Sequence, residues 1–230
     1  MKHVFIAACL LLVSSLQVAH AGVVVGGTRL VFKGAVKDTS IGLENTDKSA
    51  FLVQAWVEDE KGGDAQSVFL VTPPLFKMAP ESASLLRVIK IGNLPEDRES
   101  LFWLNVRSIP SVKSGVDANQ LTLSVQSRMK LIYRPQALLA NTVDAMAAGL
   151  QWHCRGASLG VSNPTKYYMN FASVKVSGVE IKTPGWVAPG ESKTFAGAVS
   201  GTACEVKWQV INDYGSAGQV HANTALKGNG

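Results

Sequence analysis

The sequence predicts an all-β protein made of two sandwich domains that follow a cleavable N-terminal signal peptide. Three observations lead to this prediction. The N-terminus joins a basic residue to a short apolar stretch and a small-residue triplet. Apolar and polar residues then alternate in short runs between Gly, Pro, Asn and Asp turns, at a spacing typical of sandwiches. The length of 230 residues suits two sandwiches of about 100 residues each.

The composition excludes several other classes of protein. Charged residues make up 17% of the chain and hydrophobic residues 47%, which argues against long disordered tracts. The 21 Gly and 9 Pro follow no collagen period. A net charge of +5 with no run of Lys or Arg does not indicate nucleic-acid binding.

The predicted signal peptide covers residues 1–21. Lys2 precedes the apolar stretch 4–13, and the triplet 19–21 (AHA) gives a cleavage site after Ala21. The stretch is shorter than the ~20 residues that a membrane span needs, so we expect an exported chain without membrane insertion. The alternative is a buried first strand or helix. Cleavage removes Cys9, and the remaining pair, Cys154 and Cys204, most simply forms one disulfide in an exported chain.

The first predicted domain spans residues 22–136. Its runs alternate at period two or are continuously apolar, and each is bounded by turn residues. Pro73-Pro74 interrupts this pattern. Because proline cannot lie in a central strand, that strand is expected at a sheet edge or at a switch between sheets. The expected strands are 39–43, 51–57, 68–71, 85–91, 101–109 and 121–133.

The second predicted domain spans residues 137–230. Arg134-Pro135-Gln136 ends the last run of the first domain. Residues 137–149 are poorly patterned, and their Ala-rich part, 143–148, is compatible with one or two helical turns or with a loop. The expected strands are 150–154, 158–162, 169–176, 193–198 and 205–211.

The sequence does not support a metal site, a cofactor site or a set of catalytic residues, although catalysis is not excluded. His153 and His221 do not belong to a His-Glu-x-x-His pair, and the chain has neither a paired Cys-x-x-Cys nor a carboxylate-rich calcium loop. We therefore expect no enzyme activity, no metal and no cofactor, and an exported hydrolase on a sandwich scaffold remains an unsupported rival.

The run 121–134 stands out because it joins an apolar face to a group of cations. Leu121, Leu123 and Val125 share one face at period two. The basic residues Arg128, Lys130 and Arg134 follow. A half-buried strand is the simpler interpretation. The alternative is a sheet edge that accepts an extended partner chain.

Several motifs resemble those of the periplasmic pilus-assembly chaperones. Residues 26–32 (GGTRLVF) are similar to the opening strand of that family, and residues 94–105 (LPEDRESLFWLN) match its signature segment almost letter for letter. Residues 127–135 (SRMKLIYRP) resemble the end of its last domain-one strand. Shorter matches lie at 71–76, 163–165 and 211–215, so the resemblance covers the whole mature chain in order.

The resemblance implies two immunoglobulin-like domains set at an angle, with a cleft between them. It also implies a non-enzymatic chaperone of the periplasm that binds, folds and caps pilus subunits and delivers them to an outer-membrane usher. Such subunits lack their final strand, and the chaperone lends its last domain-one strand to fill the gap. Leu121, Leu123 and Val125 match the inserting positions.

The resemblance further implies two groups of charged residues. Arg29 and Lys130 match the pair that anchors the C-terminal carboxylate of the subunit, while Glu99, Arg134 and Asp213 match a salt-bridge network between the domains. Lys130 lies five residues beyond Val125, so strict alternation points it to the opposite face. Either the strand twists or bulges there, or the cleft lies on that other face.

Two features indicate the short-loop branch of the family, which serves rod-like pili with composite tips. The connection 110–119 is short, and the first domain has no Cys. The free chaperone is expected to have the option of capping its own strand by self-association. The remaining rival is a structural or adhesive immunoglobulin-like surface protein, which would need a retention signal or its own donor strand, and neither is evident.

Overall fold

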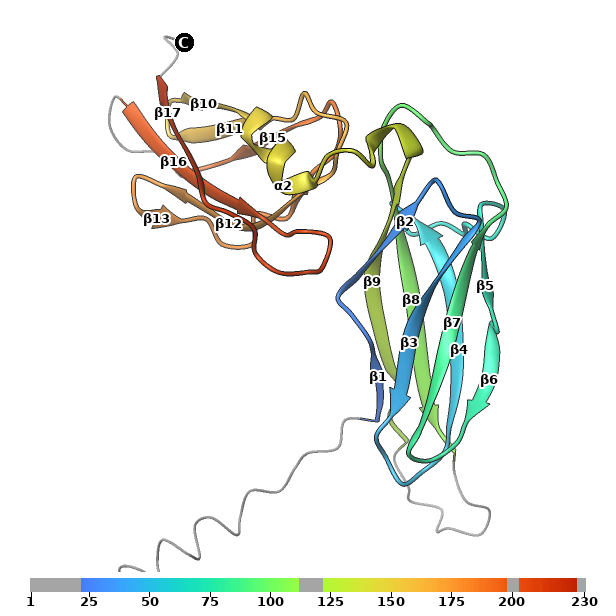
Figure 1. Cartoon of the computed structure of the whole chain (residues 1–230). Helices are drawn as coiled ribbons and strands as arrows, with labels where there is room; N and C mark the ends of the chain where they lie inside the picture. Colours follow the sequence, from blue (N-terminus) through green and yellow to red (C-terminus); the bar gives the residue numbers. More distant parts are fainter. Residues whose placement is uncertain (1–21, 112–121, 198–202, 227–230) are drawn as a thin grey trace, which may run out of the picture.

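The computed structural model describes residues 22–111, 122–197 and 203–226 as two β-sandwiches joined by a short helical connection (Figure 1). The second sandwich lies beside one end of the first, and its strands run at a large angle to those of the first. The prediction of a two-domain all-β fold is confirmed. The predicted signal peptide 1–21, Leu121 and most of the connection 110–119 lie outside the described residues.

The first domain consists of a four-stranded and a five-stranded sheet. The four-stranded sheet has the order β1 (Val23–Val25), β3 (Asp38–Asn45), β7 (Ser82–Lys90), β5 (Phe69–Thr72). The five-stranded sheet has the order β2 (Arg29–Lys33), β9 (Val125–Arg134), β8 (Ser100–Pro110), β4 (Phe51–Asp59), β6 (Leu75–Met78).

The chain passes between the two sheets repeatedly, and two of these changes occur within very short connections made of turn-forming residues. β5 is an edge of the four-stranded sheet and β6 an edge of the five-stranded one, with Pro73-Pro74 between them. The predicted switch at these prolines is confirmed. β1 and β2 are likewise separated by Gly26-Gly27, where the Gly27 N–H donates to Val25 O over 2.8 Å. A Cβ on Gly26 would lie 3.2 Å from Gly42 O, so the close approach of these backbones favours glycine.

One strand pair departs from the predicted antiparallel sandwich. β2 and β9 are parallel, with Arg29 opposite Lys130 and Lys33 opposite Arg134. A parallel pair needs a long crossover connection, and the rest of the domain supplies it, since β2 opens the domain and β9 closes it. This pairing brings together residues that lie about 100 positions apart in the sequence.

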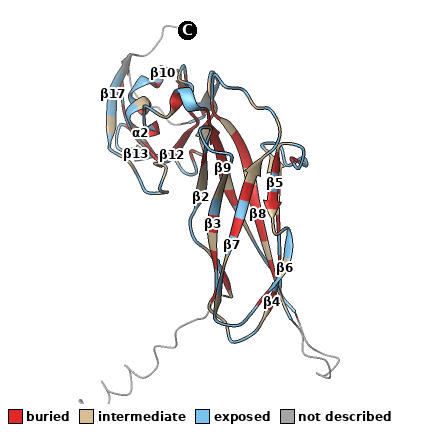
Figure 2. Cartoon of the chain, turned by 45° about the vertical axis from the view of Figure 1, so that its right-hand side comes forward, coloured by how far each residue is buried: buried red, intermediate tan, exposed pale blue. Residues whose placement is uncertain are grey.

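The core of the first domain follows the period-two pattern that predicted its strands. In β4, Phe51, Val53, Ala55 and Val57 are buried, whereas Leu52 and Gln54 are exposed. Burying each large apolar side chain contributes about 1.5–3 kcal/mol. The buried residues line the space between the two sheets (Figure 2).

The donor run was predicted as a strand over residues 121–133, but β9 begins only at Val125. The antiparallel register pairs Val125 with Ser108. Continuing it would place Leu123 opposite Pro110, which has no N–H to donate. Leu123 therefore precedes the strand.

A short helical connection links the domains. It consists of η1 (Gln136–Leu138), α2 (Val143–Met146) and η2 (Ala147–Gly149). Thr142 caps α2, since its Oγ1 accepts a hydrogen bond from Ala145 N at 3.2 Å. The helical alternative for residues 143–148 is thus the one observed. Because β9 ends at Arg134 before Pro135, residue 136 remains our proposed domain boundary.

The second domain packs a three-stranded sheet against a five-stranded one. The Cys154–Cys204 disulfide is present, and it joins β10 in one sheet to β16 in the other. The first sheet has the order β10 (Gln151–Arg155), β11 (Ser158–Ser162), β15 (Ser192–Phe195). The second has the order β13 (Val179–Glu180), β12 (Met169–Val176), β16 (Ala203–Val210), β17 (His221–Leu226), with β14 (Trp186–Val187) also paired to β12.

Candidate functional site

Three charged residues meet where the two domains join. Arg134 Nε donates to Glu99 Oε1 over 2.6 Å, and its two terminal nitrogens donate to the two carboxylate oxygens of Asp213 over 2.6 and 2.7 Å. Arg134 and Glu99 are 4% and 3% exposed. Arg134 and Glu99 belong to the first domain and Asp213 to the second, so the guanidinium bridges the domains.

Local backbone structure fixes both carboxylates. Tyr168 N donates to Glu99 Oε2 over 2.7 Å, and Glu99 N donates to the carbonyl of Lys166 over 2.9 Å. Asp213 lies in a turn in which Asn212 Oδ1 accepts from two backbone N–H groups. Gly215 closes this turn at a φ of 87°, a conformation that favours glycine. The motif 211–215 is therefore a scaffold for the Asp213 carboxylate.

The contacts of the network favour the charged form of Arg134, whereas burial raises the pKa of Glu99 despite its bonds to Arg134 and Tyr168. Burial alone would lower the pKa of Arg134, but the hydrogen bonds and charges of Asp213 and Glu99 outweigh burial and raise it. A bidentate arginine–carboxylate contact is among the strongest and most directional of polar contacts. The structure thus brings together the three residues predicted for an interdomain network.

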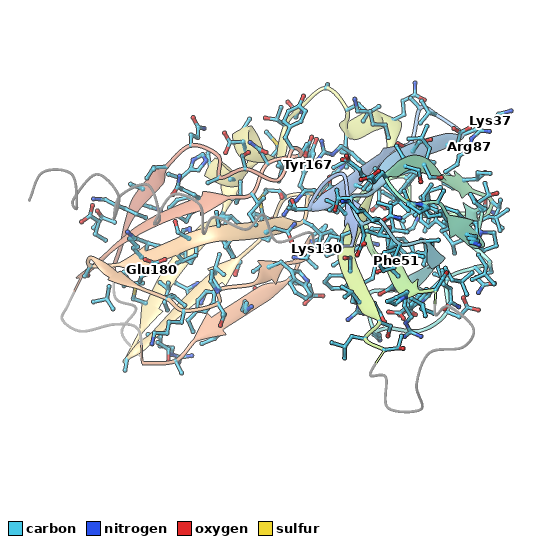
Figure 3. The ribbon with its side chains drawn as sticks, turned by 90° about the horizontal axis from the view of Figure 1, so that it is seen from below. Lys37, Phe51, Arg87, Lys130, Tyr167 and Glu180 are labelled. Atoms are coloured by element: carbon cyan, nitrogen blue, oxygen red, sulfur yellow. A yellow bond between two sulfur atoms is a disulfide. The ribbon has the colours of Figure 1, made fainter. Side chains whose placement is uncertain are left out.

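Arg29 and Lys130 lie side by side on the face of the first domain that is turned toward the second. They are direct partners in the parallel β2–β9 register. Arg29 Nη1 donates to the carbonyl of Ile211 over 3.1 Å, and its Nε is buried without a hydrogen-bond partner. Lys130 Nζ donates to Asn170 Oδ1. Figure 3 shows Lys130 between the two domains.

The unbroken register of β8 and β9 decides on which face the cations lie. From Val125 opposite Ser108 to Tyr133 opposite Ser100, no residue is skipped, so β9 contains no bulge against β8. Met129, Leu131 and Tyr133 point into the core of the first domain. Lys130 therefore points the other way, and of the two alternatives the second holds: the cleft lies on the opposite face from Val125.

Burial and neighbouring cations destabilise the charge of Lys130. Its pKa is lowered to about 8 by burial, by Arg29 and by Lys193, and only Glu60 acts in the opposite direction. Nζ lies 4.2 Å from the ring centroid of Trp186, a cation–π distance. The recorded hydrogen-bond partners of Arg29 and Lys130 are a carbonyl and an amide, both neutral. Such a site suits an added carboxylate.

Sequence reasoning missed a second interdomain contact, centred on Glu60. Its carboxylate accepts from the Tyr168 hydroxyl over 3.0 Å and from Trp186 Nε1 over 3.3 Å. Glu60 follows β4 in the first domain, in a stretch that the sequence indicated only as a turn. Nearby, a hollow of about 870 Å³ is lined by both domains. No periodic pattern marks Glu60, so its position became visible only in the folded chain.

Asn163 holds the second-domain side of this contact in place. It is 1% exposed, and its amide donates to the carbonyls of Tyr167, Val187 and Ala188. These bonds tie the segment that carries Tyr168 to the segment that carries Trp186. The family resemblance had identified the motif 163–165, but it did not indicate that Asn163 joins these two segments.

The predicted donor residues lie at the free end of the first domain, far along β9 from the cations. Leu123 is 68% exposed and Val125 is 61% exposed, values that are high for large apolar side chains. Leu121, the third predicted donor residue, lies outside the described residues. β2 pairs only with Lys130–Arg134, so the described part of the β2 side of Val125–Met129 has no strand beside it. An exposed apolar edge of this kind can pair with another chain.

The described residues contain neither a membrane-spanning helix nor a metal-binding cluster. No helix in residues 22–111, 122–197 or 203–226 is long and apolar enough to cross a membrane. Within the same ranges, no group of three or more His, Cys, Asp or Glu residues has the arrangement of a metal site.

Comparison with known families accounts for nearly the whole described chain. Residues 22–139 match the N-terminal domain of PapD, described as a pili and flagellar-assembly chaperone. Residues 145–222 match the C-terminal domain of the pili assembly chaperone PapD. The chain belongs to the pilus-assembly chaperone family.

Individual relatives of this chaperone agree with that assignment. Chaperone protein LpfB of Salmonella typhimurium is 36% identical over 204 residues, which cover 86% of this chain and 87% of the relative. Chaperone protein FimC of Escherichia coli is 39% identical over 203 residues, covering 86% and 82%. The solved complex of Salmonella enterica SafA pilin with the SafB chaperone matches with a TM-score of 0.80 and 32% identity over 90% of this chain and 98% of the other. The resemblance drawn from the sequence motifs is thereby confirmed.

Proposed function

We propose that this chaperone acts in the periplasm, without catalysis, by lending the start of β9 to incomplete pilus subunits and holding each subunit until an outer-membrane usher accepts it. Arg29 and Lys130 hold the C-terminal carboxylate of the subunit, and Leu121, Leu123 and Val125 fill its open groove. Glu99, Arg134 and Asp213 fix the angle between the domains. The relative seen in complex with a pilin supports a subunit as the partner.

The observation that carries this proposal is the arrangement along β9. The second half of the strand places Lys130 beside Arg29, where both cations have neutral hydrogen-bond partners. The other end has an edge that β2 does not cover, together with the exposed side chains of Leu123 and Val125. A partner strand anchored at the cations by its carboxylate can run along this edge. The anchor then sets the register of the partner strand.

The energetics favour capture at both ends. A carboxylate that meets a guanidinium and an ammonium forms charge-assisted hydrogen bonds, each worth about 1.5–3 kcal/mol. Each apolar side chain that becomes buried in the subunit contributes about 1.5–3 kcal/mol before ordering costs. A surface adhesin of the same fold would use neither the paired cations nor the open edge, so we favour the chaperone over this rival.

The anchor is tested by Arg29→Ala and Lys130→Ala. The chaperone variants are co-expressed in the periplasm with pilus subunits of the same host and recovered through an affinity tag. Each variant should fold normally and lose subunit co-purification, since removing one cation from a desolvated carboxylate costs on the order of 2–5 kcal/mol. Lys175→Ala is the matched control, because Lys175 lies half-exposed in the second domain, paired with Glu180.

The donor edge is tested by Leu123→Glu. A charge at this exposed position should leave the fold intact, as circular dichroism and melting would show, and should abolish subunit recovery because the carboxylate cannot enter an apolar groove. Wild-type recovery in both anchor variants, or in Leu123→Glu, would contradict donor-strand pairing at β9. A half-buried structural strand would then be the better account.

A further inference from the structure

The cleft holds a third cation, Lys193, which comes from the second domain. Lys193 lies in β15, at the edge of the three-stranded sheet. Its Nζ donates to the carbonyl of Pro184 over 2.6 Å. An ammonium has three donors, so two remain after this bond. Among the described residues, Lys193 forms no recorded ion pair, and its ring contact is with Phe195 at 5.5 Å.

Contacts to consecutive residues place Lys193 near Lys130. Lys193 Nζ contacts Pro184 and lies 2.9 Å from the position that a Cβ on Gly185 would occupy. The next residue, Trp186, lies under the Lys130 ammonium. Trp186 is also the register partner of Asn170, whose side chain accepts from Lys130. The two lysines therefore approach the same short segment, 184–186, from different domains.

Acidic neighbours offset the charges of this group only in part. Glu60 stabilises the charge of Lys130, and Asp213 and Glu99 stabilise that of Arg29, yet burial still lowers the pKa of both cations. Both carboxylate oxygens of Glu60 already accept hydrogen bonds, from Tyr168 and Trp186. Arg29, Lys130 and Lys193 thus share a partly buried region in which an added anion would relieve the repulsion that remains between the cations. This repulsion is felt at Lys130, since Lys193 is among the causes that lower its pKa.

We propose that Lys193 is a third contact for the C-terminal carboxylate of the bound subunit, so that the carboxylate is held by both domains. This inference rests on the proposed function and extends it. Lys193 makes capture selective for a free terminal carboxylate over a neutral chain end. Lys193 also makes binding of the subunit depend on the angle between the domains, because this angle keeps Lys193 of the second domain close to Arg29 and Lys130 of the first.

The test compares two forms of one ligand on variants at Lys193. The ligand is a synthetic peptide of the last strand of a co-purifying subunit, prepared with a free C-terminal carboxylate and as the C-terminal amide. In the wild type, amidation should weaken binding on the order of 100-fold. Lys193→Gln keeps a donor for Pro184 O and removes the charge. It should weaken binding of the free acid about tenfold and leave binding of the amide unchanged.

Two further variants separate a contact role from a structural one. Lys193→Met removes the bond to Pro184 O as well as the charge. If Lys193 only holds the 184–186 segment, Met will weaken the acid and the amide equally, Gln will weaken neither, and the proposal is wrong. The proposal is also wrong if amidation of the peptide weakens binding to Lys193→Gln and to the wild type by the same factor.

Arg29→Ala provides the reference for the proposed function. If amidation weakens binding to Arg29→Ala as much as to the wild type, the proposed anchor is wrong, whatever the result for Lys193.

Discussion

At the scale of single residues, Lys130 shows how one side chain can destabilise the free protein and stabilise its complex with a subunit. The ammonium lies among Arg29, Lys193 and two tryptophan rings, with Glu60 as the acidic neighbour that stabilises its charge. Burial and the two cations lower its pKa to about 8. A bound carboxylate would reverse this balance, because an opposite charge at contact distance favours the ammonium. Part of the binding free energy therefore comes from removing the unfavourable electrostatic environment that the Lys130 ammonium has in the unbound protein.

This balance predicts opposite pH dependences for stability and for subunit binding. The ordinary pKa of Lys130 is 10.5 and its value in the folded chain is about 8, so between these values the unfolded chain binds the extra proton. The free energy of unfolding of the wild type should therefore rise with pH across this window relative to Lys130→Met. Subunit binding should fall in the same window, since the anchoring ammonium loses its proton. Denaturant titrations and binding measurements at matched pH test both trends, and parallel stability curves for wild type and Lys130→Met would contradict the assignment.

At the scale of elements, β9 shows which features the sequence can predict. Period-two alternation gave the strands of the first domain, because each strand has one face on the core and one face outside it. The same rule placed Val125 and Lys130 on opposite faces, but it could not decide between a bulge and a cleft on the outer side. The continuous pairing with β8 decided this. The start of β9 was missed because it depends on Pro110, a residue of the partner strand.

Long-range pairings were the least predictable part of the site. The parallel β2–β9 register that aligns Arg29 with Lys130 leaves no local pattern in the sequence. Glu60 and Lys193 were likewise not recognised, because each lies beside a turn. Glu60 acquires its role from contacts with the other domain, and Lys193 from its bond to Pro184 O beside the segment that carries Trp186. The family motifs identified Arg29, Lys130 and the Arg134 network, whereas composition and periodicity alone indicated only surface charges.

The disulfide leads to a prediction about the second domain alone. Cys154 and Cys204 are buried in its core, and the bond closes a separation of 50 residues between β10 and β16. Cys154→Ala combined with Cys204→Ala should destabilise this domain by about 2–4 kcal/mol. The first domain, whose core contains no cysteine, should keep its stability. Hydrogen exchange resolved by domain measures both, and two free thiols per mature wild-type chain under denaturing, non-reducing conditions would contradict the bond itself.

At the scale of the whole molecule, the proposed function depends on the angle between the two sandwiches. The domains meet through a small apolar cluster of Leu101, Ile132 and Tyr168. The Arg134 network and the Glu60 contact also join the two domains. Interfaces between domains of one chain are often mobile when they are small. Directional contacts such as the bidentate Arg134–Asp213 pair can hold one angle where apolar packing alone would allow several.

The last prediction concerns this angle. Arg134→Ala removes the bridge and leaves the Glu99 carboxylate, which is 3% exposed, buried without its counter-charge. Breaking a buried ion pair from one side costs about 3–5 kcal/mol, so the melting temperature should fall clearly. Small-angle scattering should show a broader distribution of shapes, because Asp213 no longer ties the second domain to the first. Arg87→Ala is the control, since Arg87 pairs with Asp38 on the exposed surface of the first domain and its loss should change neither measurement. If Arg134→Ala melts and scatters like the control, the three charges do not set the angle. The Glu60 contact and the apolar cluster would then together be sufficient to hold it.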